Sequence, residues 1–177
     1  MRCRRSDYRP RIASQQGLTV RGASGVIEIR AGAVADRTFA AELGKRTMLD
    51  SVAAFRYVSP PMLDASYERL LEIVFSQSHV FLIAESAGER AGFLLMLDTL
   101  PDEVTRMPQG FIAYMAVEPE LRGCGVGKRL LETAEEEARR RGLPYVALMV
   151  TEENRAARAM YERAGYVTER RLLCKVL

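Results

Sequence analysis

Three glycines at alternate positions mark a segment that can bind an anion. Gly123, Gly125 and Gly127 lie within Arg122–Lys128, between an expected strand and an expected long helix. Glycines let the backbone come close to a ligand and turn several N–H groups toward it. The first N–H groups of a helix have no partners inside the helix, and the helix dipole adds partial positive charge there. Because the segment also carries a basic residue at each end, we expect it to bind a phosphate.

The spacing of these glycines excludes two common nucleotide-binding motifs. A dinucleotide fingerprint, GxGxxG, fails from either Gly123 or Gly125, because a lysine or a leucine stands where the third glycine belongs. A Walker A loop, GxxxxGK[ST], fails because Arg122 takes the place of its first glycine and an arginine follows Lys128. The spacing [RQ]xxGx[GA] does fit, with Gly127 as its last member.

A second pair of polar residues lies further along the chain. Asn154 and Tyr161 are separated by about two helical turns, so they share one face of an expected helix that ends at Gly165. Their separation along the helix axis is roughly 10 Å. The asparagine is suited to cap the helix, and the tyrosine either packs or donates a proton.

The cysteines and the single histidine do not predict a metal site. Cys3, Cys124 and Cys174 have no CxxC spacing, so neither a disulfide framework nor a zinc site is expected. His79 opens an apolar run and is expected to be structural.

Hydrophobic periodicity predicts alternating strands and helices. The expected strands are Val26–Arg30, Val80–Glu85, Arg90–Leu97, Phe111–Val117, Tyr145–Val150 and Tyr166–Val176, and the expected helices are Ala33–Leu49, Met62–Ser76, a long helix from about Val126 to Gly142, and Asn154–Ala164. Paired Pro60 and Pro61 are expected to exclude a helix from the link before Met62. This order predicts the mixed α/β class, with the helices packed on one sheet.

Between Phe111 and Tyr166 these features together resemble the GNAT superfamily of N-acetyltransferases, which use acetyl-CoA. The resemblance implies a single mixed sheet of about six to seven strands flanked by about four helices, in the order β-α-α-β-β-β-α-β-α-β. It also implies that the strand before the glycine segment splays from its neighbour and pairs with the pantetheine arm of the cofactor. The residues implied to bind the cofactor are Met115, Ala116, Val117, Arg122, Gly123, Cys124, Gly125, Val126, Gly127, Lys128, Asn154 and Tyr161.

The implied reaction is direct attack by an acceptor amine on the thioester. The resemblance makes Tyr161 the candidate acid that protonates the departing thiolate. A base is harder to find, because the strand that contains Tyr114 has neither glutamate nor histidine. Tyr114 is the first candidate, and Glu85, Asp98 and Glu103, each acting through water, stay open as alternatives. Cys124 lies in the phosphate-facing segment and is not expected to act as a nucleophile.

The acceptor is expected to bind between variable segments. These are Phe55–Tyr67, the loop Asp98–Gln109 and the final strand. Some ribosomal-protein acetylating relatives carry a glutamate where this chain has Leu148–Val150, which argues against a ribosomal N-terminus as acceptor. The acceptor itself, a small-molecule or peptide amine, is left open.

Bulk composition fits one globular domain. The chain has 177 residues, 48% hydrophobic and 28% charged, without an apolar run of the roughly 18 residues that span a membrane. The net charge of +3 is concentrated in residues 1–25, where six arginines accompany one aspartate, so a nucleic-acid partner is not expected. We expect a basic extension over 1–25, an acetyltransferase domain over 26–177, a cytoplasmic location, no membrane partner and no metal. A homodimer is left open.

Two classes of function follow from the sequence. The first is an acetyl-CoA-dependent N-acetyltransferase acting on a primary amine. The alternative, favoured by the missing base, is a catalytically inactive module that binds or senses acyl-CoA.

Overall fold

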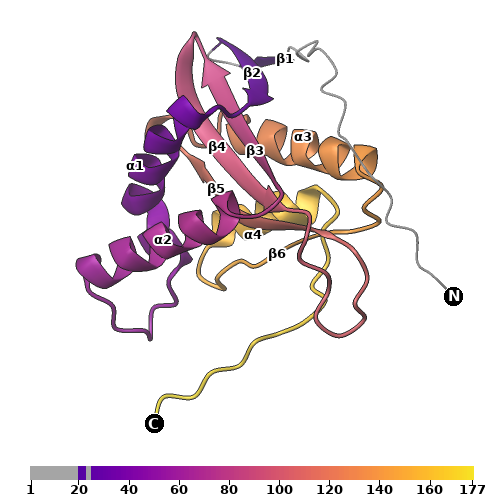
Figure 1. Ribbon diagram of the computed structural model, residues 1–177. Helices are drawn as coiled ribbons and strands as arrows, with labels where there is room; N and C mark the ends of the chain where they lie inside the picture. The colour runs from indigo at the N-terminus through magenta and orange to yellow at the C-terminus, as the bar shows by residue number, and fades with distance from the viewer. Residues whose placement is uncertain (1–19, 23–24) are drawn as a thin grey trace, which may run out of the picture.

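A six-stranded sheet organises the molecule, which is described here for residues 20–22 and 25–177 of a computed structural model (Figure 1). The strands follow one another across the sheet in chain order, and only the last pair, β5 with β6, is parallel. Their bounds are β1 Val20–Gly22, β2 Gly25–Ala31, β3 His79–Ser86, β4 Glu89–Leu97, β5 Gly110–Val117 and β6 Val146–Leu148. The predicted mixed α/β class with a single sheet is confirmed.

Four helices cover the two faces of the sheet, as predicted. Their bounds are α1 Arg37–Thr47, α2 Pro60–Phe75, α3 Val126–Arg140 and α4 Arg155–Arg163, with 3₁₀ turns η1 Val34–Asp36, η2 Met48–Ser51 and η3 Pro119–Leu121. Helices α1 and α2 pack on one face, and α3 packs on the other with α4 beside it (Figure 1).

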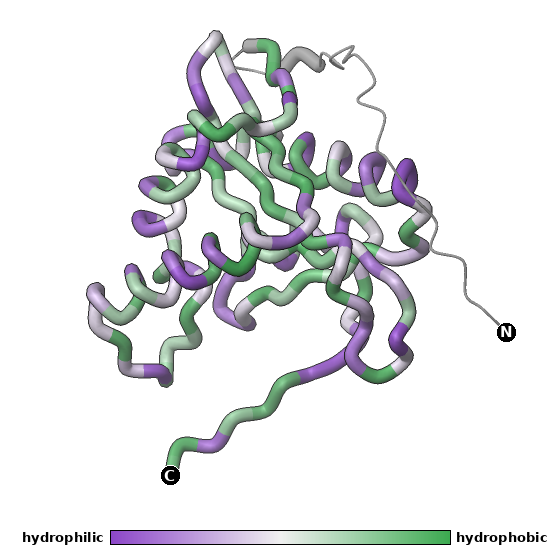
Figure 2. The backbone as a smooth tube through the Cα atoms, viewed as in Figure 1, coloured by the Kyte–Doolittle hydropathy of each residue, from purple (hydrophilic) through white to green (hydrophobic). Residues whose placement is uncertain are grey.

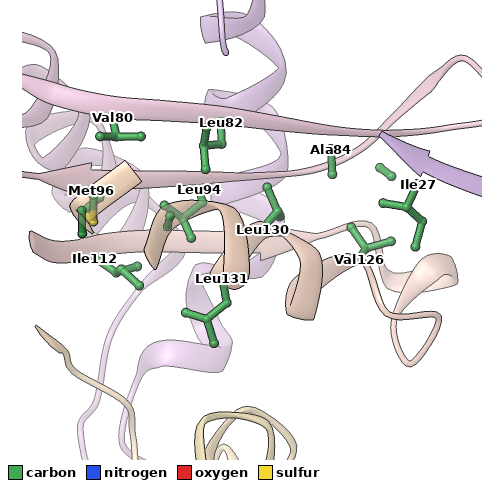
Figure 3. Packing of buried hydrophobic residues seen from close by; sticks show 13 residues of the cluster. Ile27, Val80, Leu82, Ala84, Leu94, Met96, Ile112, Val126, Leu130 and Leu131 are labelled. Carbon is green, nitrogen blue, oxygen red and sulfur yellow. The ribbon is translucent and has the colours of Figure 1, made fainter. Parts of the chain in front are cut away.

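Apolar side chains on both faces of the central strands make two cores. On the α3 face, Leu130 and Leu131 pack on Leu82, Leu94 and neighbouring strand residues (Figure 3). The other core includes buried residues of α1 and α2 and the opposite side chains of the same strands. The hydrophobic colouring of the central strands in Figure 2 follows this double burial. Because both of their faces are buried, strands β3 and β4 have nearly continuous apolar sequences.

The predicted first two helices differ from the structure at their ends. The expected helix Ala33–Leu49 is divided into η1, α1 and η2. Pro60 and Pro61 do not exclude a helix, since they form the first turn of α2. A proline suits that turn because its missing N–H would have no helical partner there.

The predicted final strand, Tyr166–Val176, is wrong. This segment carries no strand, and Leu172 and Leu173 are almost fully exposed. Arg170 instead binds the carboxylate of Asp102 at 2.6 Å, which holds the segment on the loop between β4 and β5 rather than along the short edge strand β6.

A short strand near the N-terminus, β1, was not predicted. Val20–Gly22 pairs with β2 through Val20↔Ile27 and Gly22↔Gly25. The strand lies inside the predicted extension 1–25, of which residues 1–19 and 23–24 are outside the described residues. The predicted boundary at residue 26 therefore stays a prediction.

Strand β5 pairs irregularly with both of its neighbours. Leu95 pairs with Tyr114 but Met96 pairs with Ile112, so Ala113 is an extra residue that bulges from the ladder. On its other edge, β5 pairs with β6 only from Gly110 to Ile112. Beyond Ile112, β5 runs on to Val117 with no ladder to β6 in the described chain, which confirms the expected splay.

A buried carboxylate joins η1 to the sheet. Asp36 is only 2% exposed and accepts hydrogen bonds from Arg30 at 2.7 and 3.0 Å, from Arg90 at 2.8 Å and from the backbone N–H of Ala33 at 2.9 Å. The Arg30 guanidinium, helped by these other donors, holds the pKa of Asp36 well below its usual range despite the opposing effect of burial.

Asp36→Asn should lower the free energy of unfolding by about 2–3 kcal/mol at pH 7, because Arg30 and Arg90 lose the buried carboxylate that accepts their hydrogen bonds. The carboxylate stabilises the fold above the unfolded pKa, near 4, and this contribution is lost as pH falls toward the lower folded pKa. Urea denaturation at pH 7 and pH 3 should therefore show the difference between parent and variant shrinking in acid. The exposed Asp64→Asn is the matched control, and an equal effect of both variants would contradict the prediction.

Candidate active site

The glycine segment lies at the start of α3, as the sequence predicted. Gly125 is the N-cap, with φ of 91°, and Gly123 has φ of 79°, both in the left-handed region that favours glycine. Because the N-cap is a glycine, it has no side chain that could cap the helix. A methyl group added at Gly123 would meet nothing within 4 Å. The start of α3 therefore offers backbone N–H groups beside open space.

The side chains of this segment point to different surroundings. Arg122 and Lys128 are exposed, Cys124 is half-buried, and Val126 is buried in the core against the sheet. Val126 can thus contribute to anion binding only through its backbone. The two basic side chains add positive charge around the start of the helix.

Gly127 brings α3 close to α4. A methyl group at this position would lie 3.2 Å from Sδ of Met160 and 3.7 Å from a methyl of Val117, which is tight packing. The glycine thus lets the first turn of α3, the end of β5 and the helix that carries Tyr161 approach one another.

The bulge at Ala113 decides which way the side chains of β5 point. Ile112, Met115 and Val117 pack toward α3, whereas Tyr114 and Ala116 pack toward α1 and α2. In a regular strand without the bulge, Tyr114 would share the face of Ile112, which lies two positions before it. Ala116 is buried, so its expected contact with the cofactor can be made only by its main chain.

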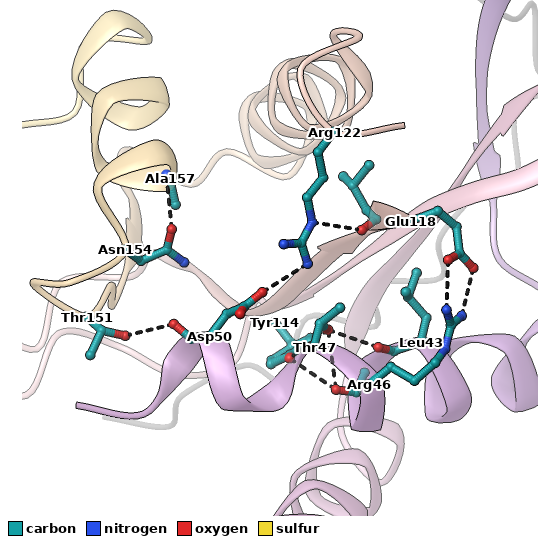
Figure 4. Close-up of polar contacts among 12 residues, drawn as sticks. Leu43, Arg46, Thr47, Asp50, Tyr114, Glu118, Arg122, Thr151, Asn154 and Ala157 are labelled. Atoms are coloured by element: carbon teal, nitrogen blue, oxygen red, sulfur yellow. Dashed lines mark hydrogen bonds and ion pairs between the residues drawn. The ribbon is translucent and has the colours of Figure 1, made fainter. Parts of the chain in front are cut away.

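Tyr114 is held by the end of α1. Its hydroxyl donates to the carbonyl of Gly44 at 3.3 Å and lies 3.2 Å from the hydroxyl of Thr47 (Figure 4). Its ring centroid is 5.0 Å from that of Tyr67, and the residue is 9% exposed. Burial raises the pKa of Tyr114. These contacts suit a residue that positions α1 against β5 better than one that accepts a proton.

Asn154 and Tyr161 occupy α4 as expected. Oδ1 of Asn154 accepts a hydrogen bond from the backbone N–H of Ala157 at 3.2 Å, which confirms the N-cap (Figure 4). Tyr161 is half-buried, with its ring centroid 5.8 Å from that of Tyr166. Burial raises the pKa of Tyr161 to about 12, so its hydroxyl keeps its proton at neutral pH.

The three alternative base candidates are held in ion pairs elsewhere. Glu85 binds Arg30 at 2.7 Å, and Glu103 binds Arg170 at 3.2 Å. Asp98 binds Arg141, directly beyond the C-terminal end of α3. That end is roughly 20 Å from the glycine segment, given the rise of 1.5 Å per residue.

Two ion pairs near the splay were missed by the sequence reasoning. Arg46 of α1 binds Glu118, the residue after β5, through two hydrogen bonds of 2.8 and 3.0 Å. Asp50 of η2 binds Arg122 at 2.9 Å (Figure 4). Each pair joins residues 72 positions apart in sequence, and no local motif distinguishes the two acidic residues from the other acids of the chain.

The segment after α1 crosses from β5 toward α4. The carbonyl of Asp50 accepts a hydrogen bond from the hydroxyl of Thr151 at 3.4 Å, and the N–H of Ala54 donates to Glu153 at 3.2 Å. The aromatic residues of the expected acceptor segment Phe55–Tyr67 differ in burial: Phe55 and Tyr57 are exposed, but Tyr67 is fully buried. Tyr67 is thus a core residue.

Neither a metal cluster nor a membrane-spanning helix is found in the part of the chain that the structure describes. No group of three or more histidine, cysteine or acidic residues there can hold a metal ion. None of its helices is both long and apolar enough to cross a bilayer.

Comparison with known proteins defines the class. The acetyltransferase (GNAT) family matches residues 47–166, more than half of the chain, so the chain belongs to this family. It is 37% identical over 86 residues to mycothiol acetyltransferase of Thermobispora bispora, a match that covers 49% of this chain and 29% of that relative. The match therefore spans less than two thirds of the relative's length.

Solved structures share the fold. A Pyrococcus furiosus protein, provisionally named an acetyl transferase, has 26% identity and a TM-score of 0.74, covering 85% of this chain and 99% of that one. A ribosomal-protein-alanine N-acetyltransferase from Brucella melitensis has 20% identity and a TM-score of 0.63, with the same coverage.

The residues present fit acetyl-CoA, the donor of the family's acetyltransferases. The uncapped start of α3 suits a pyrophosphate, and the unpaired edge of β5 suits an extended arm with amide groups. Arg122 and Lys128 supply charge, and Tyr161 supplies a protonated hydroxyl on the neighbouring helix.

Gly125→Ala should weaken CoA binding about tenfold, equivalent to about 1.4 kcal/mol, because an alanine at φ of 91° turns the first N–H groups of α3 away from their present directions. Isothermal titration calorimetry with CoA measures the change. Gly142→Ala is the matched control, since Gly142 has φ of 70° with nothing near an added methyl, but lies at the opposite end of α3. Equal CoA affinities of the two variants would contradict the assignment of the phosphate site.

Proposed function

We propose that the protein is an N-acetyltransferase that moves the acetyl group of acetyl-CoA to a primary amine of a small molecule or peptide, by direct attack in a ternary complex. The observation that carries the proposal is the parting of β5 from β6 beside the uncapped start of α3. Family membership supports the same reaction. Acetyl-CoA supplies the acetyl group as a thioester, and the neutral amine forms the C–N bond as the C–S bond breaks. The protons that the amine loses pass to solvent, since β5 has no glutamate or histidine to accept them, and the departing thiolate gains a proton.

Main-chain groups would make most of the contacts with acetyl-CoA. The N–H groups from Gly123 to Lys128 would bind the pyrophosphate, and the main chain of Met115 and Val117 would hold the pantetheine arm. A backbone N–H of β5 would stabilise the negative charge that develops on the thioester oxygen. Asn154 contributes its side-chain amide from the start of α4, since capping uses only its oxygen.

Tyr161 is the proposed acid. With a pKa of about 12 it carries its proton throughout the neutral range, and a protonated hydroxyl near the sulfur can donate to the departing thiolate. Tyr114, whose hydroxyl is bound to α1, is proposed as a positioning residue.

Tyr161→Phe should lower kcat about 100-fold, because the thiolate then leaves without a proton donor. The Kd for CoA should stay within about twofold, since the ring and its packing are retained. Stopped-flow turnover and calorimetry measure the two quantities. Tyr166→Phe is the matched control, because its ring contacts that of Tyr161 and it loses the same group. A kcat unchanged from the parent in Tyr161→Phe would remove the acid from the mechanism.

The reaction itself is tested by CoA release with a panel of polyamines, aminoglycosides, amino acids and peptides. Turnover with any amine, together with an acetylated product detected by mass spectrometry, supports the enzyme. The second candidate is an inactive acyl-CoA-binding module, which the absence of glutamate and histidine from β5 favours. Tight acetyl-CoA binding without turnover on any amine would favour that module.

A further inference from the structure

One guanidinium makes contacts with both an acid and the edge of β5. Arg122 donates to Asp50 through Nη2 at 2.9 Å, while its Nε donates to the carbonyl of Val117 at 3.4 Å (Figure 4). Both partners of the ion pair are about half exposed, at 48% and 51%. The expected pyrophosphate residue is thus already bound to a carboxylate.

Asp50 lies between the segments that follow β5 and β6. Its turn, η2, follows α1 on the α1–α2 side of the sheet, and its carbonyl accepts from Thr151 beyond β6. Asp50 therefore joins the segment after β5 to the segment after β6, and Tyr114 lies close to it (Figure 4). Glu153, which accepts the N–H of Ala54, places a second acid on the same side.

A phosphate competes with Asp50 for the Arg122 guanidinium. An exposed ion pair contributes only about 0–1 kcal/mol, whereas a phosphate binds a guanidinium through two charged hydrogen bonds. Once the guanidinium turns to a phosphate, the carboxylate loses its cation. The next cation available to it is the protonated amine of an acceptor, because such an amine has a pKa near 10.

We propose that Asp50 couples the two substrates: it binds Arg122 until the pyrophosphate of the donor takes the guanidinium, and its carboxylate then binds the ammonium group of the acceptor. The inference rests on the proposed acetyltransferase function and names a residue that it does not include. It makes the acceptor a cationic amine, and it makes donor binding favour acceptor binding.

The donor half is tested by calorimetry with CoA alone. Asp50→Asn should bind CoA about two- to fivefold more tightly, because no ion pair has to be broken and one negative charge near the phosphates is removed. Asp64→Asn carries the same change of charge on α2 and should match the parent. Weaker CoA binding by Asp50→Asn, or equal tightening in both variants, would overturn the coupling.

The acceptor half is tested by steady-state kinetics with the panel amine that the parent turns over fastest. Asp50→Asn should raise the KM for this amine at least about tenfold, which is the loss expected when an ammonium group loses its carboxylate partner. Asp50→Glu should restore much of the affinity. A merely structural role would weaken donor and acceptor together, whereas the coupling changes them in opposite directions.

The two failures are distinguishable. If the parent acetylates an amine and Asp50→Asn has the same KM, only the coupling is wrong. If the parent binds CoA but turns over no amine of the panel, the proposed function and the acceptor role of Asp50 fail together.

Discussion

Backbone hydrogen bonding at the edge of β5 is the constraint on which the rest of the structure depends. Peptide groups in a strand need partners, and β6 supplies them only as far as Ile112. Past that point the strand continues to Val117 because β4 still pairs with its other edge. The unpaired edge is therefore held rigidly in the extended form, and a ligand that supplies amide groups can complete it without reorganising the sheet.

The bulge at Ala113 determines which residues of β5 face α1 and which face α3. It turns Tyr114 toward α1, where its hydroxyl reaches Gly44, and leaves Met115 and Val117 on the side of α3. Helix α1 is fixed a second time by Arg46, which binds Glu118 just past the strand. Because both contacts hold α1 on β5, the η2 turn that follows brings Asp50 to Arg122 and Thr151.

Features encoded locally were predictable from the sequence. Alternate glycines before a helix, and an asparagine two turns before a tyrosine, depend on short spacings, and the structure places both where they were expected. The failures are long-range. Tyr166–Val176 has residues suited to a strand, but Arg170 binds the carboxylate of Asp102 in the loop between β4 and β5. Asp50 looks like any acid in a turn until the fold brings Arg122 beside it. Tyr67 and Tyr57 are both aromatics of one segment, and only packing separates a core residue from a surface one.

The close approach at Gly127 sets a division between rigid and adaptable parts of the protein. Direct packing against Met160 fixes α4 on the first turn of α3, so the distance from the phosphate-facing amides to the Tyr161 hydroxyl does not depend on any loop. The proposed binding site for acetyl-CoA is thereby built on one rigid unit, the packed pair of α3 and α4. The segment from Val52 to Tyr57, which is half-buried or exposed on the opposite side, is free to diverge in sequence, whereas Asp50 before it is bound to Arg122. Acceptor preference can therefore change in evolution while the geometry for the donor is conserved.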